Sequence, residues 1–156
     1  MTRILGIDPG LQHTGWGVID AKGNQLSFVA CGAVHSDPKL PTPARLQQLH
    51  DGLHKIIALH KPSEAAVEET FINKNASSSL KLGHARGAIL LSLSLAGVPV
   101  AEYSANLVKK SVVGKGHADK AQVAMMVKVL LPHSVAESAD AADALAVAIT
   151  HAHHRR

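Results

Sequence analysis

The order of the apolar segments along the chain limits the fold more than any other feature of the sequence. Segments 3–8, 14–20 and 25–34 are rich in apolar and β-branched residues and are separated by turn sequences, so they predict three strands in an antiparallel meander. Further along, helical spacing predicts helices over 43–60, 76–96, 104–113, 119–131 and 139–151, with strands over 65–68 and 98–103. This order predicts an α/β fold with a mixed five-stranded sheet flanked by helices.

Length and composition indicate one folded domain. The 156 residues fit a single domain, 1–156, of which about 152–156 would form a flexible tail rich in His and Arg. Hydrophobic residues make up 46% and charged residues 18%, which excludes an intrinsically disordered chain. The single cysteine, Cys31, indicates a reducing compartment, so we expect a cytoplasmic protein. The longest mostly apolar stretch, 88–101, is shorter than the about 20 residues of a membrane span, and we expect no membrane association.

Positive charge is concentrated in the middle of the sequence. Residues 71–130 contain eight Lys and Arg against two Asp and Glu, whereas both flanking parts are slightly acidic. This distribution indicates a polyanionic partner such as nucleic acid, with a solvated surface that keeps the protein soluble as the alternative. The basic candidates for DNA binding are Lys74, Lys81, Arg86, Lys109, Lys110, Lys115 and Lys120.

Four carboxylates stand in apolar surroundings. Asp8 and Glu68 each end a predicted strand, whereas Asp140 and Asp143 lie three residues apart on one face of an alanine-rich predicted helix. Strand ends border the ligand crevice of an open α/β sheet, so the four side chains would converge if this helix packs across the sheet. Four oxygen donors without thiol or imidazole ligands would select Mg²⁺ or Mn²⁺.

Each carboxylate also has a simpler interpretation. Asp8 could bond the backbone of the Pro-Gly turn that follows it, and Glu68 could belong to a solvated strand end. Asp140 and Asp143 could cap the N-terminus of their helix and compensate its dipole. The apolar sequence around them argues against all four simple interpretations holding at once.

Several short motifs follow one another along the chain. They are Gly6-Ile-Asp8-Pro-Gly10 with Thr14-Gly15, Val67-Glu68, Phe71 with Asn73-Lys-Asn75, Leu80-Lys-Leu-Gly83 with Ala85-Arg-Gly87, Val112-Val-Gly114, and Asp140-Ala-Ala-Asp143-Ala-Leu-Ala. From about residue 3 to residue 151, the chain resembles the RuvC-type Holliday-junction resolvases. The first Asp-x-Gly turn alone is shared with the wider ribonuclease-H-like and actin-like superfamilies, but the complete set in this order is specific.

The resemblance implies a ribonuclease-H-like fold and a homodimer that nicks two strands of a four-way DNA junction symmetrically, in recombination and repair. It carries over a metal site, with two ions per subunit, onto Asp8, Glu68, Asp140 and Asp143. It also places Lys109 and Lys120 near the scissile phosphate, where Lys120 would help to neutralise charge and Lys109 would position the phosphate. A branch-migration motor complex is a further candidate partner.

Other segments have two interpretations each. Phe71 would stack on an unpaired base at the junction centre, or it would anchor the following helix in the core. Lys115 lies in a glycine-flanked loop and would clamp the DNA backbone. The predicted helix that contains Gly83 and Gly87 resembles the family's dimer interface, with simple packing on the sheet as the alternative.

Three other functions remain open. An RNA-maturation nuclease of the same superfamily gives no reason for the Asp140–Asp143 pair. A junction-binding protein that does not cut would gain nothing from carboxylates that face phosphate, and an actin-like sugar kinase needs two such domains. His50 and His54 lack the His-Glu-x-x-His pattern of a zinc enzyme, and the histidines at the C-terminus predict a weakly basic tail rather than a metal site.

Overall fold

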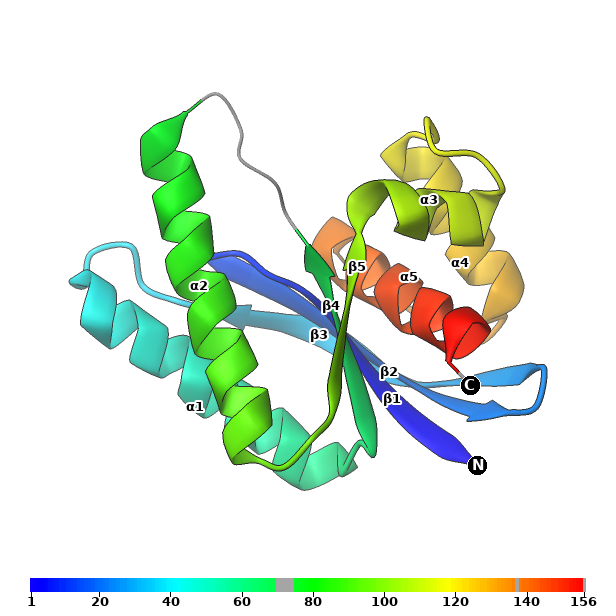
Figure 1. Ribbon diagram of the computed structural model, residues 1–156, viewed down its shortest axis with the longest axis horizontal. Coiled ribbons are helices and arrows are strands. Elements are labelled where there is room, and N and C mark those ends of the chain that lie inside the picture. The colour runs from blue at the N-terminus through cyan, green and yellow to red at the C-terminus, as the bar shows by residue number, and fades with distance from the viewer. Residues whose placement is uncertain (70–74, 137, 156) are drawn as a thin grey trace.

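The computed structural model of the protein describes residues 1–69, 75–136 and 138–155. Within these residues, five strands form one sheet in the order β3-β2-β1-β4-β5 (Figure 1). The strands are β1 (Thr2–Asp8), β2 (His13–Lys22), β3 (Gln25–His35), β4 (Glu64–Glu69) and β5 (Val100–Ser104). The first three strands are antiparallel neighbours, whereas β1, β4 and β5 run parallel, so the prediction of a mixed sheet is confirmed.

Helices cover both faces of this sheet (Figure 1). The helices are α1 (Thr42–His60), α2 (Ala76–Leu95), α3 (Ala105–Val113), α4 (Lys120–Leu130) and α5 (Ala139–His154). α1 and α2 lie on one face, and α5 lies across the other face with α3 and α4 packed against it. All five predicted helices are present. Nowhere in the described part of the chain does a helix have both the length and the apolarity that crossing a membrane requires.

The C-terminal end of the fold differs from the prediction. The last helix was expected to end at residue 151, but α5 continues to His154. His151 is buried, and its Nδ1 lies 2.8 Å from the hydroxyl oxygen of Tyr103. Arg155 then donates a hydrogen bond to Glu64 at 2.8 Å. The helix is longer than expected because these contacts hold its final turn against the sheet.

Alternation along the strands directs two carboxylates to the face that α5 covers. In β1, Ile4 belongs to the core that α5 helps to form, whereas Ile7 belongs to the core beneath α1 and α2. Side chains on a strand alternate between the two faces, so Asp8 falls on the same face as Ile4. In β4, Ala66 packs on the α5 side, and Glu68, two residues further on, shares that face.

Glycines allow α5 to approach the sheet very closely. A Cβ atom built on Gly6 would collide with the carbonyl oxygen of Ala144, and one built on Gly15 would collide with the carbonyl oxygen of Asp140. The backbones of sheet and helix are therefore in direct contact. Leu145 and Ile149 of this helix are fully buried, and each such side chain contributes about 1.5–3 kcal/mol to folding.

Candidate active site

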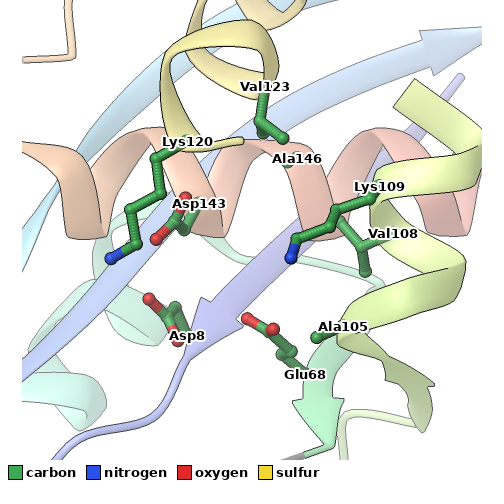
Figure 2. A pocket seen from close by; sticks show the side chains of 9 residues that line it. All are labelled: Asp8, Glu68, Ala105, Val108, Lys109, Lys120, Val123, Asp143 and Ala146. Atoms are coloured by element: carbon green, nitrogen blue, oxygen red, sulfur yellow. The ribbon is translucent and has the colours of Figure 1, made fainter. Parts of the chain in front are cut away.

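A cleft of about 230 Å³ lies where β1 and β4 end beneath α5 (Figure 2). Asp8 from β1, Glu68 from β4 and Asp143 from α5 direct their carboxylates toward one another across it. Lys109 of α3 and Lys120 of α4 flank these carboxylates with their ammonium groups (Figure 2). Five different elements thus contribute one charged side chain each to the same cleft.

The remaining wall of the cleft is apolar. It consists of Ala105, Val108, Val123 and Ala146. Nothing in the sequence distinguishes these four residues, because small and β-branched residues on a helix look like ordinary core positions. Their effect is electrostatic, since an apolar wall keeps water from the carboxylates and makes their ionisation more costly.

Helix caps fix the positions of the two lysines. The hydroxyl of Ser104 accepts a hydrogen bond from the backbone N–H of Leu107 at 3.1 Å and so begins α3, one turn before Lys109. At the start of α4, the backbone N–H of Gln122 donates to the Asp119 carboxylate at 2.8 Å, and the backbone N–H of Asp119 donates to the Gln122 side chain at 2.9 Å. This capping box encloses Lys120, the first residue of the helix. The backbone that carries each lysine is therefore fixed by local sequence.

Two of the simpler roles for the carboxylates are filled by neighbouring hydroxyl groups. In the Pro-Gly turn, the hydroxyl of Thr14 accepts from the N–H of Gly10 at 3.2 Å and donates to its carbonyl oxygen at 2.6 Å. At the start of α5, Ser138 is the capping residue and accepts from the N–H of Ala141 at 3.1 Å. Asp8 is therefore not needed to stabilise the turn, and Asp143 is not needed to cap α5, so both carboxylates can serve the cleft.

The cleft holds more negative charge than its surroundings compensate. Burial raises the pKa of Asp8 to about 8 in the metal-free protein, and the charges of Glu68, Asp143 and Asp140 raise it as well. Burial also raises the pKa of Glu68 and of Asp143, although Lys109 and Lys120 oppose this rise. A bound cation would relieve the repulsion and would replace the proton that Asp8 retains at neutral pH.

The chemistry of these donors fits a hard divalent ion, although the metal-free arrangement is not a ready-made shell. Within the described residues, no three His, Cys, Asp or Glu side chains are placed so that they could hold one ion together. The cleft nevertheless contains three carboxylates and neither thiol nor imidazole, the donor set that suits Mg²⁺ or Mn²⁺.

Asp140 stands apart from the other three predicted ligands. It lies in the first turn of α5 against Gly15 and is not among the residues that line the cleft in the described structure. Its negative charge still raises the pKa of Asp8 and of Asp143. Asp140 therefore acts on the cleft through its charge, and its role as a ligand stays a prediction.

The other predicted DNA-binding residues lie outside the cleft. Lys81, Lys110 and Lys115 are exposed on α2, on α3 and in the loop that precedes α4. Arg86 forms an ion pair with Glu102, so its charge is already compensated within the protein. Phe71 and Lys74 lie outside the described residues.

Comparisons with known proteins agree on one family. Residues 4–151 match the family model described as crossover junction endodeoxyribonuclease RuvC. A protein of that name from Rhodopseudomonas palustris (strain BisB18) is 60% identical over 153 residues, which cover 98% of this chain and 87% of the relative. A protein of the same name from Bradyrhizobium diazoefficiens is 60% identical over 154 residues, covering 99% and 88%.

Solved structures extend this agreement to the fold. Thermus thermophilus RuvC in complex with a Holliday junction substrate matches with a TM-score of 0.90 at 36% identity, over 97% of this chain and 93% of that one. The yeast mitochondrial Holliday junction resolvase matches with a TM-score of 0.71 at 13% identity, over 97% and 78%, and shares the fold. The sheet order, its covering helices and these neighbours define the class of ribonuclease-H-like proteins. Within this class, the chain belongs to the RuvC family of crossover junction endodeoxyribonucleases.

Proposed function

We propose that this chain resolves four-way DNA junctions by paired, symmetric, metal-dependent hydrolysis of phosphodiester bonds, in homologous recombination and DNA repair. Family membership and the similarity to a RuvC structure that contains a Holliday junction support this activity and substrate. The convergence of Asp8, Glu68 and Asp143 in one cleft between two lysines supports the location of the reaction.

We assign the metal ligands to Asp8, Glu68, Asp140 and Asp143, with two Mg²⁺ or Mn²⁺ ions per subunit. Such a pair of ions, when bound, activates a water molecule and stabilises the departing 3′ oxygen. Asp8 is the central ligand because it lies between Glu68 and Asp143 in the cleft, and the charges of Glu68, Asp143 and Asp140 all act on its carboxyl group. Asp140, further out, would complete the set or orient a water molecule.

The lysines act on the phosphate. Lys120 lies at the start of α4 on the Asp143 side of the cleft, where its ammonium would offset the charge that develops on the scissile phosphate (Figure 2). Lys109, next to Glu68, would position the same phosphate. Lys81, Lys110 and Lys115 would bind the DNA backbone outside the cleft, and the same roles stay predictions for Lys74 and, by base stacking, for Phe71.

Two symmetric cuts require two active sites, so we propose a homodimer formed through α2. This helix exposes Leu80, Leu91 and Leu95 by 61%, 59% and 72% of their surfaces. An apolar groove of about 520 Å³ runs between α1 and α2 beside them. A second copy of the chain would bury this surface. A motor-complex partner and a cytoplasmic location stay predictions.

Cleavage of a synthetic mobile four-way junction, beside a linear duplex, tests the function. We expect paired nicks in the junction only, with Mg²⁺ or Mn²⁺ and not with a chelator. Asp8→Asn should lower the nicking rate by on the order of 10³-fold and leave junction binding intact. Asp51→Asn, an exposed carboxylate on α1, is the matched control and should cut normally. Junction binding without nicks under every metal would support the non-cutting alternative instead.

A further inference from the structure

Two exposed histidines face each other at the edge of the sheet, apart from the carboxylate cleft. His13 begins β2 and His35 ends β3, and the two residues are direct partners in the antiparallel ladder. Their Nδ1 atoms lie 2.6 Å apart, and their rings meet edge to face with centroids 4.8 Å apart. Neither residue lines the carboxylate cleft.

The backbone next to this pair is fixed by its own hydrogen bonds. The backbone N–H of Ser36 donates to the carbonyl oxygen of Gln12 at 3.1 Å, and its hydroxyl donates to the carbonyl oxygen of Leu11 at 2.5 Å. Arg45 of α1 in turn donates to the Ser36 hydroxyl at 3.0 Å. The two strand ends are thus held together without help from the imidazoles, so a ligand between the rings need not order the backbone.

We propose that His13 and His35 form a two-imidazole site for a borderline transition-metal ion of the Zn²⁺ type. In the metal-free pair one Nδ1 carries the shared hydrogen and the other offers its lone pair to it. Two imidazole nitrogens at about 2.0–2.1 Å from one tetrahedral zinc ion lie about 3.3–3.4 Å apart, so a rotation of the rings that separates the two nitrogens by less than about 1 Å suffices. The donor ring moves its hydrogen from Nδ1 to Nε2 through solvent exchange, and both rings then bind as neutral ligands.

This site differs in chemistry from the carboxylate cleft. Imidazole nitrogen suits Zn²⁺, Ni²⁺ and Cu²⁺, whereas carboxylate oxygen suits Mg²⁺ and Mn²⁺. No third His, Cys, Asp or Glu of the described residues completes the set, so the other coordination positions belong to water. The two sites can therefore be filled by different metals at the same time.

A second pair of histidines provides a comparison. His50 and His54 lie one turn apart on α1, with ring centroids 6.0 Å apart in a stacked arrangement. The Nδ1 of His50 already lies 2.7 Å from the hydroxyl oxygen of Ser92. That nitrogen is occupied and the rings are stacked, so we expect this pair to bind a metal ion more weakly than His13 with His35.

Titration of the full chain with ZnCl₂, in excess Mg²⁺ to occupy the carboxylates, tests the proposal by nitrogen NMR of the imidazole rings. We expect the Nδ1 signals of His13 and His35 to shift together and to saturate at one equivalent. His35→Gln should weaken the effect at His13 by about tenfold or more, whereas the matched variant His54→Gln should leave it unchanged.

Backbone amide spectra confirm that each variant is folded, and thermal unfolding supplies a second measurement. Zn²⁺ should raise the melting temperature of the wild type and of His54→Gln, and not that of His35→Gln. The proposal is wrong if Zn²⁺ first shifts other histidines, or if His13 responds in the same way after His35 is replaced.

Discussion

α5 and α2 are both rich in small residues, but the two helices occupy opposite environments. In α5, ten of 16 residues are buried, and a Cβ atom on Gly6 or Gly15 of the sheet would collide with its backbone. In α2, only four of 20 residues are buried, and a Cβ atom on Gly83 or Gly87 would meet nothing within 4 Å. Small residues thus permit close contact within the monomer in one helix, whereas in the other they lie open to solvent.

The difference separates the helix that serves the cleft from the helix that we propose for association. α5 carries Asp140 and Asp143, so its distance from the sheet sets how near these carboxylates come to Asp8. α2 gains little from its own glycines, which even weaken a helix by up to about 1 kcal/mol each relative to alanine. An exposed apolar surface with this composition fits contact with a second chain.

The largest effect should come from adding a methyl group where the backbones of the sheet and α5 are in direct contact. Gly15→Ala places a methyl group against the backbone of Asp140, which must move away from the cleft. We expect the single-turnover nicking rate to fall by roughly 100-fold and the Mg²⁺ requirement to rise, with stability lowered by about 1–3 kcal/mol. Gly83→Ala is the control, and its monomer should keep its stability or gain up to about 1 kcal/mol. Wild-type nicking by Gly15→Ala would contradict the close-contact explanation.

The next largest effect concerns the buried carboxyl group of Asp8 and the pH dependence of the free energy of unfolding. The pKa of Asp8 is about 8 in the folded metal-free protein and 3.8 ordinarily, so the folded state binds more protons between about pH 4 and pH 8. Stability of the wild type should therefore decrease as the pH rises through this window. Asn is neutral throughout, so Asp8→Asn should be more stable above pH 8, by on the order of 2 kcal/mol, and should lose this advantage toward pH 4.

Urea unfolding at several pH values, in a chelator, measures this difference. Asp51→Asn, on the exposed surface of α1, should show no such pH-dependent gain. Mg²⁺ should stabilise the wild type at high pH and leave Asp8→Asn unchanged. If Asp8→Asn is less stable than the wild type at every pH, burial and repulsion of the Asp8 carboxylate do not destabilise the fold.

A smaller effect is expected on the open face of α2. Leu91→Asp places a charge in the proposed interface, and the dimer dissociation constant should rise by about tenfold or more. Sedimentation analysis measures the assembly, and junction cleavage should change from paired to single nicks. Leu59→Asp, on α1, is the matched control because Leu59 is also exposed, by 76%. Equal behaviour of the two variants would exclude α2 as the interface.

The smallest effect should follow from a lysine that lies in neither of these two helices. Lys115→Ala removes one exposed charge from the loop before α4. Junction binding should weaken a few-fold, and the slope of log affinity against log salt should decrease by about one. An unchanged slope would mean that Lys115 does not contact phosphate.

Sequence patterns predicted the elements well because periodicity and turn residues are local signals. Alternation in β1 and β4 even places Asp8 and Glu68 on one face. The apolar wall of Val108 and Val123 was not predictable, since its identity depends on which helices border the carboxylates. The same holds for the contact between His13 and His35, which depends on strand register, and for the ion pair of Arg86 with Glu102. The DNA-binding role of Arg86 stays a prediction.

An anomalous-difference map of crystals grown with Mn²⁺ would show whether the cleft binds metal. We expect manganese peaks in the cleft, bound by Asp8, Glu68 and Asp143, and none in Asp8→Asn crystals grown in the same way. A map without a peak near Asp8, from wild-type crystals of a preparation that cuts junctions, would contradict it.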